Sequence, residues 1–311
     1  MNAASTPTNS AKKKSPLVFW GVFLAATIGL GVGAGFGMTK LLKPDSIQYI
    51  VDEDQYTIDM EATRKKYQAA KSSKNFASLT PEEMINIGYD LFAQDENNYT
   101  VGVGYTQAAM VRQIIQTRSV KMGDRFFEES NSIGMVNLYD RMFQEGDNTV
   151  KYWGSTPDYG SNQPETVSNA DYRIAMGRNV SDSLVYIVSE KTKIETPSPG
   201  DPPNGIYQEN GDYRVEITLD PTTSVARYQC QMQTISNLKY KPTFDFVHLS
   251  VVLDADLNLI KMTTHEKYFA TISSGLGSTG EGSLTTMYYH EAPSYGFPSV
   301  NSKLPDFPDS L

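Results

Sequence analysis

The spacing of apolar positions changes along the central part of the chain, and this change predicts its secondary structure. Thr80 and Glu83 form a capping box with a proline at the first helical position between them. Apolar residues then recur at helical spacing, which predicts a helix over Pro81–Gln94. From Tyr99 to Tyr105 the pattern alternates with period two, which is typical of a strand with one buried face.

Several β-prone segments follow this first strand and are separated by short turns rich in glycine, aspartate and asparagine. They cover residues 109–121, 125–131, 135–143 and 149–153. Strands at such regular spacing predict an antiparallel meander. After a long loop, the apolar run at 185–195 predicts another strand.

The last third of the chain predicts the rest of the sheet. A strand at 213–219 precedes a helix at Thr222–Asn237, and the runs 244–253 and 257–272 form a hairpin. A final strand at 283–290 closes the sheet. The predicted fold is therefore α+β: a curved antiparallel sheet, half-barrel-like, packed on two helices.

The size of this sheet predicts a cavity. Two helices of about 14 to 16 residues span roughly 21–24 Å, whereas seven or more strands at about 4.8 Å spacing form a wider sheet. The sheet must therefore curl around the helices, and curling opens an apolar pocket. We expect Tyr228 and Met232 to line part of it.

The longest apolar stretch lies before this domain. Residues 17–38 contain no charged side chain, and 22 residues are enough to cross a bilayer as a helix. Three lysines precede the stretch and two follow it, which favours an N-terminus in the cytoplasm and the remaining chain outside. A cleaved signal peptide is the alternative, although its apolar region is usually only about 7–15 residues long.

Small residues recur at every fourth position within this predicted transmembrane helix. They share one helix face and are Gly21, Ala25, Gly29, Gly33 and Gly37. Such a groove lets two helices approach closely in lipid, which predicts self-association or a membrane-protein partner. Glycine is also simply common in membrane helices, and that alternative stays open.

The chain accordingly divides into five parts. Residues 1–16 are a disordered cytoplasmic tip, 17–38 the transmembrane helix, and 39–77 a juxtamembrane linker or stalk. Residues 78–292 are the extracytoplasmic α+β domain, and 293–311, with four prolines, are a disordered tail.

Charge and cysteine content restrict the partners and the compartment. Residues 44–311 hold 22 basic and 36 acidic side chains, a net charge of −14, which disfavours nucleic acid and other polyanions as partners. Cys230 is the only cysteine, so no intrachain disulfide can form. An exported domain without disulfides fits a bacterial cell envelope.

Motifs for metals or catalysis are weak. The turn Asp254-x-Asp256-x-Asn258 resembles the start of a calcium loop, but Leu259 stands where that loop needs glycine. His248 and His265 lie on opposite arms of the hairpin without a third ligand nearby, and we expect them to face solvent. We find no nucleophile motif and no phosphate loop, so we expect neither an enzyme nor a cofactor.

The order of elements also carries a resemblance. The meander, the phrase LDPTTSVARYQCQMQ and the hairpin turn DADLNLIKM resemble membrane-anchored extracytoplasmic proteins of Gram-positive bacteria. Over roughly 80–290 the order is also similar to bacterial lipoprotein-carrier half-barrels, in which a curved sheet wraps helices around an apolar cavity. The chain departs from those carriers in its predicted membrane helix, where they have a cleaved signal or a lipidated cysteine.

Two hypotheses for the function follow. The first is an interaction or scaffold component of a cell-envelope assembly, indicated by the glycine groove and the lack of a catalytic set. The alternative is a module that binds an apolar ligand, a lipid or a lipid-linked precursor, as the carrier resemblance implies. In both, the protein is held in the lipid bilayer by a single pass.

Overall fold

The computed structural model describes residues 57–311, apart from 109–110, 135–136, 160–163, 177–183, 237, 239 and 272–276. Its main feature is one 12-stranded antiparallel sheet, in the order β6-β5-β4-β3-β2-β1-β12-β11-β10-β9-β7, with β8 also paired to β9. The strands are β1 Asn97–Ala108, β2 Val111–Met122, β3 Arg125–Ile133, β4 Leu138–Glu145, β5 Asn148–Gly154, β6 Glu165–Ser168, β7 Lys193–Ile194, β8 Gly205–Glu209, β9 Asp212–Leu219, β10 Thr243–Leu253, β11 Leu259–Thr271 and β12 Gly277–Tyr289.

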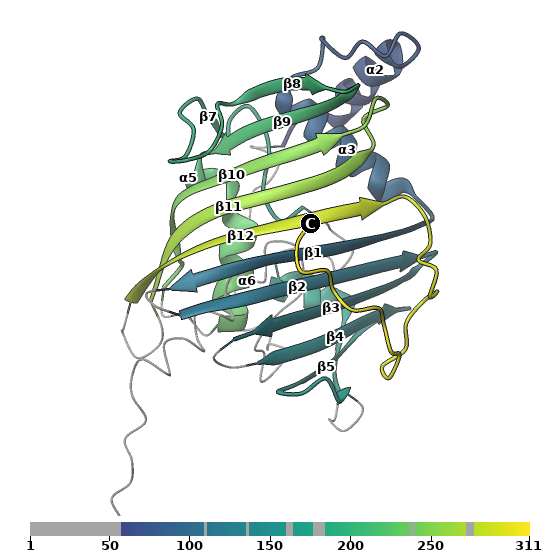
Figure 1. The fold of residues 1–311 in the computed structure, drawn as a ribbon, viewed down its shortest axis with the longest axis vertical. Helices are drawn as coiled ribbons and strands as arrows, with labels where there is room; N and C mark the ends of the chain where they lie inside the picture. The colour runs from purple at the N-terminus through teal and green to yellow at the C-terminus, as the bar shows by residue number, and fades with distance from the viewer. Residues whose placement is uncertain are drawn as a thin grey trace, which may run out of the picture.

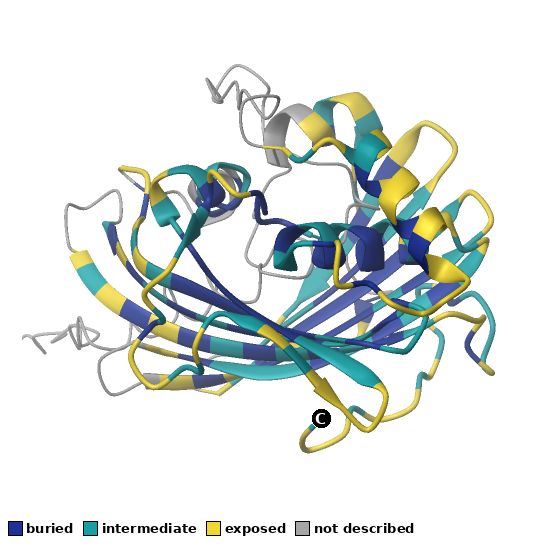
Figure 2. Ribbon diagram, turned by 90° about the horizontal axis from the view of Figure 1, so that it is seen from above, coloured by how far each residue is buried: buried dark blue, intermediate teal, exposed yellow. Residues whose placement is uncertain are grey.

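Helices cover one face of this sheet, which we call the helix-covered face. The helices are α2 Met60–Lys71, α3 Pro81–Gln94, α4 Asn169–Met176, α5 Pro221–Ser224 and α6 Ala226–Ser236. The sheet is strongly curved, and α3 and α6 lie on its concave side (Figures 1 and 2). We call the opposite, convex side the outer face. The α+β class and the curved antiparallel sheet agree with the expectation from the sequence.

The first and last strands meet in the middle of the sheet. β1 pairs along its whole length with β12, for example Val101 with Met287, and pairs with β2 on its other side. The meander β1–β6 and the later strands β9–β12 are therefore two half-sheets joined at the β1–β12 pair.

Apolar side chains on the helix-covered face of the later half-sheet form most of the core. Val215 and Ile217 of β9, and Leu249 and Val251 of β10, are fully buried beneath the helices. Apolar residues recur at every second position of β9 and β10 because one face of these strands is buried beneath the helices. Helix α3 begins with the expected capping box, in which Thr80 and Glu83 bond each other's backbone N–H groups.

The segment 185–195 is the clearest wrong prediction of secondary structure. Only Lys193–Ile194 form a strand, while Val185 to Val188 are all buried, without alternation. The N–H of Ile187 bonds the carbonyl of Ser224, so this segment crosses the core as an irregular connection. A continuous apolar run does not distinguish such a segment from a strand.

The predicted boundaries of the domain are too narrow at both ends. Within the proposed stalk 39–77, helix α2 packs on the domain: Tyr67 is buried and Arg64 forms an ion pair with Asp90 of α3. The tail 293–311, predicted to be disordered, lies along the outer face of the sheet instead (Figure 1). Arginine side chains of the sheet bind its carbonyl groups, which the proline count alone does not reveal.

The predicted transmembrane helix 17–38 and the cytoplasmic tip lie outside the described residues. In the part of the chain that is described, no helix is both long and apolar enough to cross a bilayer. The five small residues Gly21, Ala25, Gly29, Gly33 and Gly37 also lie outside it, so the packing groove stays a prediction.

Candidate functional site

Tyr228 and Met232, expected to line a cavity, are both residues of α6 and lie in the core. Each has no exposed surface. The Tyr228 hydroxyl donates to a carboxylate oxygen of Glu266 over 2.8 Å, and Tyr186 donates to the other oxygen over 2.7 Å. Both side chains are therefore packed into the core, and their part in lining a cavity stays a prediction.

Glu266 is an acidic residue buried in the hydrophobic core. Burial raises the pKa of its carboxyl group to about 7, although the hydrogen bonds from Tyr186 and Tyr228 oppose the shift. The pKa values of both tyrosines are also raised, first by burial and then by the neighbouring carboxylate. These three residues attach both α6 and the irregular segment 184–188 to strand β11, which is a structural role.

Polar residues dominate the helix-covered face where the meander begins. Cross-strand pairing aligns Thr286 of β12, Gly102 of β1, Thr117 of β2, Ser130 of β3 and Asp140 of β4 in one row. We call this row the hydroxyl ladder. It continues into Met262 of β11, whose sulfur accepts a hydrogen bond from Tyr89 of α3, so the ladder lies on the side of the helices.

Most hydroxyl groups of this region have no hydrogen-bond partner among the described residues. The hydroxyl oxygens of Thr286, Thr117 and Ser130 are buried and unpaired, as is that of the nearby Ser132. A buried polar group without a partner costs about 1–3 kcal/mol. Several in one place indicate that water or a ligand completes their hydrogen bonds.

The last residue of the ladder, Asp140, forms an ion pair. Lys151 of β5 contacts Asp140 at 3.2 Å, and both are almost completely buried. Burial raises the pKa of Asp140 to about 7, and the attraction of Lys151 opposes this rise. The ladder therefore ends at an ion pair. An uncharged polar group can lie beside this pair, because neither Asp140 nor Lys151 is left there as an unpaired buried charge.

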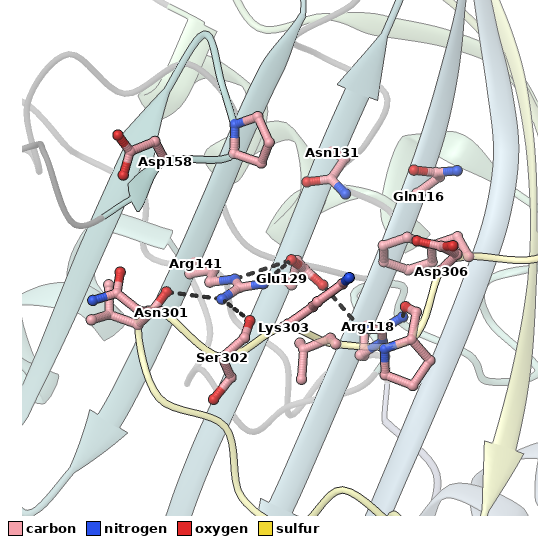
Figure 3. Close-up of a pocket in the computed structure, with 15 residues that line it drawn as sticks. Gln116, Arg118, Glu129, Asn131, Arg141, Asp158, Asn301, Ser302, Lys303 and Asp306 are labelled. Carbon is pink, nitrogen blue, oxygen red and sulfur yellow. Dashed lines mark hydrogen bonds and ion pairs between the residues drawn. The ribbon is translucent and has the colours of Figure 1, made fainter.

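The outer face carries a second site, under the tail 293–311, which we call the C-terminal strap. Arg118, Glu129 and Arg141 are direct cross-strand neighbours on β2, β3 and β4. Glu129 lies between the two arginines, at 3.3 Å from Arg118 and 2.8 Å from Arg141 (Figure 3). All three are buried although they lie on the outer face, because the strap covers them.

The two arginines hold the strap by its backbone. Arg118 donates to the carbonyl of Pro305 over 2.6 Å, and Arg141 donates to those of Val300 and Ser302, each over 2.8 Å (Figure 3). The Arg118 guanidinium also lies 4.3 Å from the centre of the Phe307 ring. Such contacts fix an extended chain that forms no strand with the sheet.

A pocket of about 670 Å³ remains between the strap and the sheet. Gln116 and Asn131 are cross-strand partners on β2 and β3, and in Figure 3 both lie beside the arginine pair. Asp158 lines the pocket from the loop after β5, and Lys303 and Asp306 line it from the strap. Its volume is in the range of small-molecule sites.

The histidines of the hairpin do not behave alike. They are direct partners across the strands, but His248 is almost fully buried, which contradicts the expected exposure. The loop that contains Asp201 folds over this part of the outer face, and Asp201 contacts His265 at 2.9 Å. His248 bonds Glu216 at 2.9 Å beneath it.

The remaining sequence motifs have structural roles in the described part. Oxygens of Asp254 accept hydrogen bonds from the backbone N–H groups of Asp256 and Asn258, as in a polar turn. Among the described residues, no three acidic, histidine or cysteine side chains come together in a metal-binding arrangement. Cys230 lies in α6.

No protein-family model matches the chain, and no curated protein matches its sequence. Solved structures give distant likenesses. The lipoprotein LppX of Mycobacterium tuberculosis matches with 9% identity and a TM-score of 0.31, over 69% of this chain and 97% of its own. A DUF1329 family protein from Desulfovibrio piger matches with 10% identity and a TM-score of 0.25, over 69% of this chain and 95% of its own.

Proposed function

We propose that the chain is a non-enzymatic binding module that holds an amphiphilic, lipid-like molecule on the helix-covered face of its sheet. The observation that carries this proposal is the hydroxyl ladder, in which the buried hydroxyl groups of Thr117, Ser130 and Thr286 have no hydrogen-bond partner among the described residues. Of the two hypotheses from the sequence, this supports ligand binding. The scaffold hypothesis depends on residues 17–38, which are outside the described part.

The surroundings of the ladder suit a ligand with two kinds of surface. The next row of the same face runs through Leu284, Gly104, Ile115, Ser132 and Leu138 and is largely apolar. An acyl chain would lie against this row, while a hydroxyl- or amide-bearing head group would bond the ladder. A purely apolar ligand would leave the ladder unpaired.

The proposed site differs from the cavity expected at Tyr228 and Met232. The buried hydroxyl groups without partners among the described residues lie farther along the sheet, so we place the ligand over β12 and the meander. As in the sequence interpretation, residues 17–38 would keep the module at the outer side of a cell membrane. Catalysis plays no part in the proposal.

The test is the identification of molecules that copurify with the full chain. The protein is purified in detergent, extracted with organic solvent, and the extract is analysed by mass spectrometry. We expect a stoichiometric amphiphile that is reduced at least fivefold in Thr117→Val and in Thr286→Val. Valine keeps the shape of threonine and removes only the hydroxyl group that the ligand would bond.

The matched control is Thr285→Val, one residue from Thr286 but on the outer face, where Thr285 bonds Thr263 at 3.0 Å. It should retain the ligand. This variant also carries the same predicted membrane helix as the unchanged chain. Lipid that adheres to residues 17–38 is therefore equal in all variants and does not contribute to the difference between them. Equal lipid content in all variants, or no stoichiometric lipid in the unchanged chain, would contradict the proposal.

A further inference from the structure

The pocket on the outer face, under the C-terminal strap, is separate from the proposed lipid-like site, because the whole thickness of the sheet lies between them. Its lining is polar and contains equal numbers of cationic and anionic side chains. The cations are Arg118, Arg141 and Lys303, and the anions are Glu129, Asp158 and Asp306. A lining without net charge disfavours a strongly charged ligand.

The two arginines are already occupied. Arg118 and Arg141 both bind Glu129, and their remaining hydrogen bonds go to strap carbonyls. An anion would have to replace a buried carboxylate and break the strap contacts at the same time. This arrangement therefore argues against a phosphate or carboxylate site, although two arginines in a pocket suggest one at first sight.

Two side-chain amides at the floor are free to bind. Gln116 and Asn131 face each other across β2 and β3. Asn131 is 7% exposed, and its oxygen accepts only a long bond of 3.4 Å from Tyr159. Its amide nitrogen and the whole Gln116 amide have no partner among the described residues. Each amide supplies both donors and an acceptor.

The strap provides the opposite wall with complementary groups. Lys303 offers donors and Asp306 acceptors, and neither forms an ion pair among the described residues. The ring of Phe307 adds a planar apolar surface to the lining. Adjacent donors and acceptors beside an aromatic ring match a molecule whose hydroxyl groups each donate and accept hydrogen bonds.

We infer that the pocket binds an uncharged, polyhydroxylated ligand, a saccharide, between the Gln116–Asn131 amide pair and the strap. The arginine pair positions the strap and thereby forms one wall of the site. With a volume of about 670 Å³, the pocket can hold a ligand of the size that small-molecule sites usually take. The strap then acts as the roof of a binding site.

The experiment uses the full chain in a detergent without a sugar head group, so that the detergent does not compete. Maltose and di-N-acetylchitobiose are titrated by saturation-transfer NMR and calorimetry, with inorganic phosphate as the anionic probe. We expect at least one of the two sugars to bind and phosphate not to bind. Gln116→Met and Asp306→Asn should each weaken sugar binding at least fivefold.

Gln208→Met is the matched control, because Gln208 is an exposed residue of β8, far along the sheet from the pocket. It should bind sugar like the unchanged chain. If Gln116→Met unfolds, Asp306→Asn on the strap still decides the question. Absence of binding by both sugars, binding unaffected by either pocket variant, or binding of phosphate instead would overturn the inference. None of these results bears on the copurified lipid.

Discussion

The Tyr228 hydroxyl donates a hydrogen bond to the Glu266 carboxyl group over 2.8 Å and thereby joins α6 to β11 in the core. Tyr186 completes the cluster from the connection before β7. The acid is fully buried, and its pKa is raised to about 7. Glu266 must therefore contribute to the pH dependence of the folding stability.

The expected effect has a definite sign. Below pH 4.5 the carboxyl group is protonated in both states, whereas between pH 4.5 and 7 the unfolded chain releases its proton first. Stability from this group is thus lost as the pH rises through about 7, by about 3 kcal/mol in total. Glu266→Gln should gain that amount relative to the unchanged chain between pH 4.5 and 8, measured by denaturant unfolding. Asp140 is present in both proteins, so its own titration cancels; a constant difference would refute the assignment.

Ser130→Ala should stabilise the protein in the absence of ligand. The Ser130 hydroxyl is buried and has no partner among the described residues, so its removal relieves a desolvation cost of about 1 kcal/mol. For a domain of this size, the melting temperature should rise by about 2–4 °C after the ligand has been extracted. Ser250→Ala is the control, because Ser250 donates to Glu216 over 2.9 Å. It should instead lower the melting temperature.

Glu129→Gln should weaken the strap. The substitution leaves two buried arginines without their shared anion, and breaking a buried ion pair costs about 3–5 kcal/mol. Hydrogen exchange of residues 300–307 should accelerate at least tenfold, while exchange in β9 and β10 changes less. Uniform acceleration over the whole domain would mean that the strap and the sheet unfold together.

Gly104→Ala should disrupt the junction of the two half-sheets. A Cβ atom at Gly104 would lie 2.1 Å from the Ser283 carbonyl oxygen and 2.6 Å from Cα of Leu284, both in the backbone of β12. Since backbone atoms cannot rotate away, we expect a loss of about 3 kcal/mol. Gly102→Ala should cost less, because its nearest neighbour is the rotatable hydroxyl of Thr117. A similar loss at both positions, measured by denaturant unfolding, would argue against the β1–β12 register.

The sequence predicted elements whose signals are local. Helix Pro81–Gln94 begins at its capping box, and the β10–β11 hairpin turns at Asp254 as expected. Which face of a strand is covered depends on segments far away in the sequence, and the local pattern does not predict it. The alternation in β1 predicted one buried face but did not identify it: the helix-covered face carries Thr100 and the two glycines, while Tyr99 stacks on Tyr289 on the outer face.

The candidate sites were harder to predict for the same reason. The hydroxyl ladder takes one small residue from each of several strands, and only the register brings them into one row. For the strap, the prolines of 293–311 suggested disorder. Phe297 and Phe307 could have indicated that this segment packs on the domain. Their rings stack on Arg125 and Arg118, and a disordered tail seldom carries such aromatic anchors.

The pairing of β1 with β12 also sets the order in which the molecule can be completed. Val101 pairs with Met287, about 190 residues later in the chain, so the central contact of the sheet joins residues that are far apart in the sequence. Until then, β1 and the edge of the later half-sheet expose unpaired backbone groups that can pair with other chains. A newly synthesised copy would therefore keep these edges unpaired until its last strand has formed, and a truncation before Gly277 would leave both edges open to pairing with other chains.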